Sequence, residues 1–322
     1  SARQHAGGAS AVEFAPAGGA WLSAGSDGAA LLGGGAGAPR RLAAGRPIAH
    51  AEHHPSRPLI ALRREDGAAE IWSTETGALV ARREPVSAAP GRIHLHPDGR
   101  RALLHGEGDE PPGLWSWEDD RFEPFPVKGP IYAAAMSDSG LVALATEEGV
   151  LVARDPAQPA STIPLPGAIP LHLAFSPGGD ALAAACGDTL VRLVAPRSSE
   201  VRALRGHTAT VSWVGFVPGT SLLASASGDG TVRIWNGDSL APLAVLRGHD
   251  GPIVDAAVAP DGASLASVGM DGRVAIWNLA REARPARDVL SWIRCRVPRE
   301  LRDGRIAPRA RPPGCSEPRQ PR

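Results

Sequence analysis

The chain has 322 residues, and its 34 basic and 34 acidic residues leave a formal net charge of zero at pH 7. Its apolar content is enough for a large buried core, which argues against both a membrane protein and a disordered chain. The 38 glycines and 31 prolines, beside one tyrosine and five phenylalanines, are typical of many short strands and turns and argue against long helices.

The use of cysteine and lysine bears on the cellular compartment and the source of the chain. Cys186, Cys295 and Cys315 are an odd number without metal-ligand spacing, which argues against a disulfide framework and a zinc site and favours a reducing, cytoplasmic location. Lys128 is the sole lysine, and this arginine bias suggests a bacterial chain from a GC-rich genome. Because the sequence opens at Ser1 without a methionine, we expect a longer parent chain upstream.

Apolar runs that end in a turn residue recur along the whole chain. The turn residues, called markers below, are Pro16, Pro55, Pro97, Ser137, Pro177, Pro218 and Pro260. Their spacings by subtraction are 39, 42, 40, 40, 41 and 42 residues. An acidic turn residue recurs with the same period, at Asp27, Asp66, Asp109, Glu148, Asp188, Asp229 and Asp271. A fixed period of about 40 to 45 residues is typical of β-propeller blades.

Each repeat is expected to contain four short strands. In the sixth repeat the segments VSWVGFV, SLLASAS, TVRIWN and PLAVLRG are separated by turns that contain glycine, and Asp-Gly before an alternating run favours a hairpin. Such a sheet buries both faces only if several pack radially. The sequence therefore predicts an all-β, seven-bladed propeller over residues 1–280, with blades near 5–45, 46–86, 87–127, 128–166, 167–206, 207–248 and 249–280.

The sixth and seventh repeats, RGH…LASASGDGTVRIWN and RGH…LASVGMDGRVAIWN, resemble the WD-repeat family. The resemblance implies a hydrogen-bonded network of His, Ser, Asp and Trp in each blade. The matching residues are His207, Ser225, Asp229 and Trp235 in the sixth repeat and His249, Ser267, Asp271 and Trp277 in the seventh. A buried indole N–H needs an acceptor, and a carboxylate can fix an imidazole. This Ser-His-Asp set is therefore interpreted as structural, and no catalytic residue is predicted.

The other repeats keep only part of this pattern. The first has His5, Ser23 and Asp27 but Gly33 at the Trp position, and the second has Asp66 and Trp72 without the His. The third offers Trp115 or Trp117, while the fourth and fifth have Arg154 and Val194 there.

In the family, a strand from one terminus usually completes the blade formed by the other. Here that strand is expected upstream of Ser1 or near Arg284 to Trp292, or is absent. Residues 281–322 contain 12 Arg and 5 acidic residues, a net charge of +7, which leaves −7 for residues 1–280. We expect a short amphipathic helix with Val289, Trp292, Ile293 and Val297 on one face, followed by a disordered tail.

The resemblance also implies peptide binding on the face where the innermost strands begin. Counting five residues back from each marker gives Ala11, His50, Arg92, Tyr132, His172, Trp213 and Asp255. We call these seven positions the mouth ring, and we expect the last six to contact a partner, since neighbouring positions are mostly apolar and suited to packing. The alternative is that they are ordinary strand-start residues.

Two other binding chemistries were weighed. Glu13, Glu52, His53, His54, His94 and His96 are plausible metal ligands, but their spacing reflects the repeat rather than a ligand motif, so no metal or other cofactor is predicted. The arginines of the tail could bind nucleic acid, yet aromatic residues hardly occur among them, so this role is not favoured.

The sequence therefore favours a non-catalytic scaffold, monomeric and without a membrane anchor, that binds protein or peptide partners. The alternative is a regulatory region of a larger bacterial kinase or NTPase that is cut at Ser1. A propeller hydrolase or lyase would have the same fold, which alone does not exclude it.

Overall fold

The computed structural model describes residues 5, 9–15, 20–34, 38–43, 45–85, 90–106, 111–127, 129–158, 160–279, 299–302 and 305–308. The chain divides into two compact units, Ser1–Trp277 and Asn278–Arg322.

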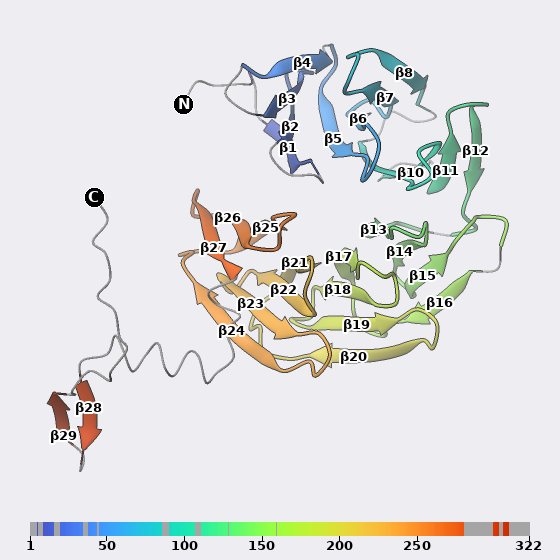
Figure 1. Cartoon of the computed structure of the whole chain (residues 1–322). Helices are drawn as coiled ribbons and strands as arrows, with labels where there is room; N and C mark the ends of the chain where they lie inside the picture. The colour runs from blue at the N-terminus through green and yellow to red at the C-terminus, as the bar shows by residue number, and fades with distance from the viewer. Residues whose placement is uncertain are drawn as a thin grey trace. The chain divides into compact units, whose positions relative to one another are not determined.

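In the described part of the first unit, six four-stranded sheets and one three-stranded sheet follow one another along the chain (Figure 1). They are called blades 1 to 7 in chain order, and the strands of each blade pair in the order in which they occur in the sequence. Every pairing whose register is resolved is antiparallel, as in hairpins joined by short turns.

The strands of blades 1 to 4 are β1 (Ala9–Phe14), β2 (Ala20–Gly25), β3 (Ala30–Gly34), β4 (Arg40–Ala43), β5 (Ile48–His53), β6 (Leu59–Arg64), β7 (Ala69–Ser73), β8 (Leu79–Arg83), β9 (Gly91–Leu95), β10 (Arg101–Gly106), β11 (Gly113–Ser116), β12 (Arg121–Pro124), β13 (Ala133–Met136), β14 (Val142–Thr146), β15 (Gly149–Ala153) and β16 (Ser161–Pro164). The strands of blades 5 to 7 are β17 (Pro170–Phe175), β18 (Leu182–Cys186), β19 (Val191–Ala195), β20 (Glu200–Leu204), β21 (Val211–Phe216), β22 (Leu222–Ser227), β23 (Thr231–Asn236), β24 (Pro242–Arg247), β25 (Ile253–Val258), β26 (Ser264–Gly269) and β27 (Val274–Asn278).

The turn between the second and third strands explains the recurring acidic residue. In blade 6 the Asp229 carboxylate accepts the amide of Thr231, and Gly230 has a φ of 75°. Glycine adopts this left-handed conformation without a steric penalty. The Asp-Gly pairs of the sequence therefore mark tight turns, as the hairpin signal predicts.

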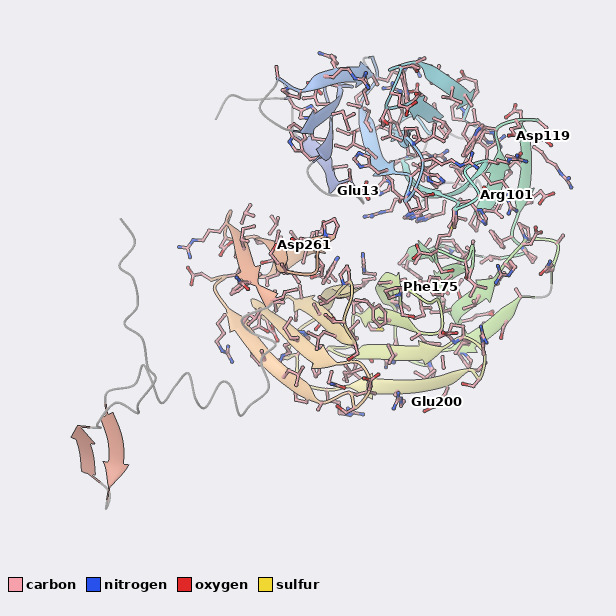
Figure 2. The ribbon with its side chains drawn as sticks, viewed as in Figure 1. Glu13, Arg101, Asp119, Phe175, Glu200 and Asp261 are labelled. Atoms are coloured by element: carbon pink, nitrogen blue, oxygen red, sulfur yellow. The ribbon has the colours of Figure 1, made fainter. Side chains whose placement is uncertain are left out.

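The hydrophobic core lies in the seams between neighbouring blades. Leu22 of blade 1 packs with Ile60 of blade 2, and Leu173 of blade 5 packs with Val150 of blade 4. Figure 2 shows side chains filling the spaces between sheets, with Glu13 and Phe175 of inner strands toward the middle and Glu200 of an outer strand at the periphery. Blades 1 to 6 thus bury apolar side chains against their neighbours in chain order, and β25 of blade 7 contacts β21 and β22 of blade 6. The predicted seven-bladed all-β propeller is confirmed.

Blade 7 differs from the others, because no fourth strand pairs with β27 among the described residues. Ile276 of β27 is 70% exposed, whereas the corresponding Ile234 of blade 6 is fully buried. The segments expected to supply a closing strand, residues 1–4 and the region from Arg284 to Trp292, lie outside the described residues.

In the second unit, the described residues form a two-stranded antiparallel hairpin of β28 (Arg299–Arg302) and β29 (Arg305–Pro308). This hairpin was not among the elements expected for the tail. Arg302 pairs with Arg305 across a two-residue connection whose sequence is Asp-Gly, a strong hairpin signal. The helix expected around Trp292 lies outside the described residues.

The described residues contain no helix that is both long and apolar enough to cross a membrane.

Candidate functional site

Blade 6 contains a closed network of the four residues singled out by their spacing. His207 Nδ1 lies 2.9 Å from Asp229 Oδ2, and His207 Nε2 lies 2.8 Å from Ser225 Oγ. The indole of Trp235 donates to the same hydroxyl at 2.9 Å. Ser225 is fully buried, so its hydroxyl satisfies two buried nitrogen atoms at once.

Blades 7 and 1 contain related networks. His249 lies 3.1 Å from Asp271 and 2.9 Å from Ser267 Oγ, which also accepts the Trp277 indole at 2.9 Å. In blade 1, His5 Nδ1 lies 3.0 Å from Asp27 Oδ1, and His5 Nε2 lies 2.9 Å from Ser23 Oγ.

The electrostatics of the blade 6 network fit a structural role. The pKa of Asp229 is lowered to about 2, because hydrogen bonds from Thr231, His207 and the Thr208 amide outweigh the effect of burial. Burial lowers the pKa of His207, which keeps its imidazole neutral at pH 7. The Ser225 hydroxyl is engaged by both His207 and Trp235 inside the blade.

Blade 2 replaces this network with one that sequence reasoning missed. Leu62 stands where blade 6 has its serine, and the Trp72 indole donates instead to Glu70 at 2.9 Å. The two oxygens of Glu70 also accept the Arg64 guanidinium at 2.8 Å each, and both side chains are at least 96% buried. The sequence signal for this network was Glu70, a charged residue two positions before Trp72 in an otherwise apolar strand.

In blade 3, Trp115 and not Trp117 takes the buried position, and its indole donates to Asp120 at 2.9 Å. In blade 1, the ring of Trp21 fills the space beside Gly33, which leaves no room for a side chain there. Trp21 and Gly33 are directly paired across β2 and β3. In blade 1 the bulky ring therefore comes from the second strand, whereas in blade 6 it comes from Trp235 on the third strand.

A repeated backbone irregularity positions the mouth ring. The register between the first and second strands shifts immediately before the ring residue in blades 1, 2, 5, 6 and 7, for example between Ile48 and His50 and between Val211 and Trp213. Such β-bulges re-aim the side chain that follows and often occur beside functional sites. Arg92 of blade 3 lies in an uninterrupted register opposite His105.

The mouth ring residues differ in exposure, and three of them line a cavity. Arg92, Tyr132 and His172 line one cavity of about 370 Å³, and the His172 ring lies 5.9 Å from that of Trp213. Arg92 and Asp255 are exposed and His50, Tyr132 and His172 are half-buried, whereas Trp213 is only 7% exposed. Trp213 therefore offers little contact surface.

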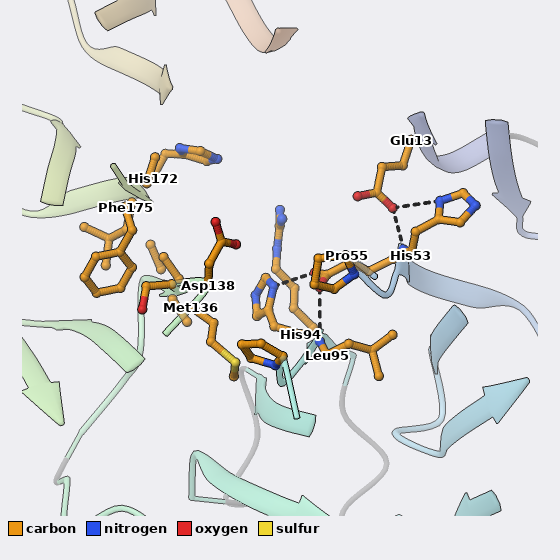
Figure 3. Close-up of a pocket in the computed structure, with 18 of the residues that line it drawn as sticks. Glu13, His53, Pro55, His94, Leu95, Met136, Asp138, His172 and Phe175 are labelled. Atoms are coloured by element: carbon orange, nitrogen blue, oxygen red, sulfur yellow. Dashed lines mark hydrogen bonds and ion pairs between the residues drawn. The ribbon is translucent and has the colours of Figure 1, made fainter. Parts of the chain in front are cut away.

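The cavity continues along the inner strands beyond the mouth ring. Glu13, Asp138 and His172 project toward its open space from different blades (Figure 3). Its volume lies within the range of about 300–1,000 Å³ that is typical of ligand pockets. Ala134 and Ala174 form a small-residue wall on the side of blades 4 and 5.

Two glutamates in the cavity link neighbouring blades. Glu13 of blade 1 accepts the backbone amide of His53 at 2.7 Å, and Glu52 of blade 2 accepts the amide of Leu95 at 3.0 Å. Glu52 also contacts His94 Nδ1 at 2.7 Å. Burial, together with the charge of Glu52, raises the pKa of Glu13.

The six residues weighed as metal ligands separate into different pairings. Glu13 contacts His53 and Glu52 contacts His94, whereas His54 Nε2 lies 3.1 Å from a backbone carbonyl and His96 contacts Asp98 at 3.0 Å. Within the described residues, no group of three or more ligand-type side chains has the geometry to hold a metal ion.

The cavity histidines predict a pH dependence of stability. Burial lowers the pKa of His50 to about 3 and that of His172 to about 4, and the charge of Arg92 acts in the same direction. An unfolded histidine binds a proton near pH 6.5, so the unfolded state gains protons first as the pH falls. The free energy of unfolding should therefore decrease between pH 6.5 and 4.

Urea unfolding at several pH values measures this slope. It should be shallower in His172→Gln, because one proton-linked group is removed. An unchanged slope in that variant would show that His172 does not contribute.

Comparison with known proteins identifies the repeats. Residues 198–236 and 240–278 each match the WD domain, G-beta repeat family, and each segment contains one complete His-Ser-Asp-Trp network. These two segments therefore match the WD repeat at the residues that the sequence pattern indicates.

Among curated proteins, the chain is similar to WD repeat and HMG-box DNA-binding protein 1 from three vertebrates. The identity is 46% over 65 residues for Xenopus laevis, 44% over 66 residues for Mus musculus and 43% over 65 residues for Homo sapiens. Each match covers 20% of this chain and only 6% of the relative's length. These relatives give no support to the bacterial origin suggested by composition.

Proposed function

We propose that this WD-repeat propeller is a non-catalytic scaffold that binds a peptide segment of a partner protein at the mouth ring. The observation that carries the proposal is the cavity of about 370 Å³ lined by Arg92, Tyr132 and His172, which belong to three different blades. Aromatic and arginine side chains are enriched among residues that dominate protein interfaces.

Nucleic acid is not the proposed partner of the propeller. Residues 1–280 carry a net charge of −7, and phosphate backbones are bound by surfaces rich in Lys and Arg. The vertebrate relatives are named as DNA-binding proteins, but the match covers only 6% of their length, so that property is not carried over to this chain.

The proposal is tested with the full chain and a display library of random linear peptides. Peptides enriched on the wild type are measured in solution by fluorescence polarisation. Tyr132→Ala should weaken their binding by at least about tenfold, as expected for an interface anchor. The control is Leu243→Ala, since Leu243 is 47% exposed on the outer strand β24.

Equal affinities for Tyr132→Ala and the control would contradict binding at the mouth ring. Thermal unfolding of each variant verifies that the propeller is intact. Trp213→Ala is less suitable, because Trp213 is buried and its removal would leave a void in the wall.

A further inference from the structure

Arg92 is the cation of the cavity that has no partner of its own. It lies near the start of β9, is exposed to the cavity and makes no hydrogen bond or ion pair within the described part of the chain. Its charge nevertheless acts on His50 of blade 2, His172 of blade 5 and Asp255 of blade 7. Arg92 thus lies centrally among the blades.

The carboxylates of the cavity are not available to Arg92 as partners. Glu13 and Glu52 are both used to link blades, through the amides of His53 and Leu95. Asp138 lies two residues beyond the end of β13, whereas Arg92 is the second residue of β9, so the two lie toward opposite ends of the inner strands. The guanidinium therefore keeps its donors free for a ligand.

Two imidazoles near Arg92 add hydrogen-bonding capacity without adding charge, whereas the carboxylate of Asp255 is a charged group within reach of its field. Burial, reinforced by Arg92, lowers the pKa of His50 and of His172, so both imidazoles are neutral at pH 7. His172 Nδ1 is buried, and the backbone amide of Val214 is the donor that acts on its imidazole.

We infer that Arg92 binds the carboxylate of an acidic side chain, Asp or Glu, of the partner peptide, with His172 as a neighbouring hydrogen-bonding group. This inference rests on the proposed function and names the chemistry of its ligand. One arginine among neutral imidazoles matches a singly charged carboxylate, since a phosphate carries nearly two charges and is usually met by several arginines. Tyr132 and the alanine wall line the same cavity as Arg92.

The test uses the peptides enriched on the wild-type chain. Each acidic residue is replaced in turn by its amide, Asp by Asn and Glu by Gln, and also by phosphoserine. For one acidic position, the amide should bind about tenfold to hundredfold more weakly than the acid. In Arg92→Met, acid and amide should bind alike, whereas Arg197→Met should behave like the wild type, because Arg197 is 90% exposed on a turn of blade 5.

The outcomes separate this inference from the proposed function. Peptides that depend on Tyr132 but lack an acid preference would overturn the inference and leave the proposed function intact. Acid preference that persists in Arg92→Met, or phosphoserine binding more than tenfold tighter than the acid, would also overturn it. The absence of any peptide that depends on Tyr132 would contradict the proposed function and the inference together.

Discussion

Replacing Glu70 by alanine is expected to lower the free energy of unfolding by about 3–5 kcal/mol, the usual cost of breaking a buried ion pair. Glu70 is 3% exposed and accepts hydrogen bonds from Arg64 and Trp72. Without it, the Arg64 guanidinium, which is 4% exposed, loses its carboxylate while it remains buried. Urea unfolding at pH 7 measures the loss.

The matched control is Glu84→Ala, because Glu84 also pairs with an arginine but is 74% exposed. Surface ion pairs of this kind contribute about 0–1 kcal/mol. A second variant, Arg64→Met with Glu70→Leu, removes both charges and should recover part of the stability. Similar losses for Glu70→Ala and Glu84→Ala would show that the pair in blade 2 is not the stabilising element described above.

Trp235→Ala is expected to reduce the free energy of unfolding by about 3–5 kcal/mol, through lost burial and the void left behind. Trp235 is 1% exposed and packs in the seam between blades 5 and 6 with Val191 and Leu204. Its indole hydrogen bond to Ser225 is lost as well. Thermal and urea unfolding of the variant measure the effect.

Trp277→Ala is the natural comparison, since Trp277 makes the same 2.9 Å bond to its serine but is only half-buried in blade 7. The loss should be clearly smaller than in Trp235→Ala. Because the hydrogen bonds match, the difference reports seam packing. Equal losses would contradict the assignment of stability to the seam.

Much of the fold could be predicted from the sequence, because strands and turns of each blade follow from residues that are close together in the chain. The markers from Pro16 to Pro260 and the Asp-Gly turns fix the period of the blades. The hairpin at residues 299–308 was missed although Arg302 and Arg305 flank the same Asp-Gly signal, because that region was interpreted by composition instead. A closing strand for blade 7 would need pairing between distant segments, which no local pattern specifies.

The candidate site was predictable in its positions but not in its connections. Counting back from the markers placed Arg92, Tyr132 and His172, which line one cavity. The link from Glu52 to Leu95 joins residues 43 positions apart in neighbouring blades, so it depends on how the sheets are stacked. Likewise, a β-bulge places one extra residue in one strand of a pair, and no residue type in this sequence predicts where that occurs.

The repeated β-bulge before the mouth ring has a consequence for how binding preferences could change. At Ile48 and His50, the irregularity uncouples the ring residue from the strict alternation that governs the rest of the strand. A substitution at His50 therefore does not alter the pairing register of the residues packed between the blades. Under the proposed function, single substitutions at an exposed or half-buried position of this kind, such as His50, change which peptides bind while the packing between blades stays the same.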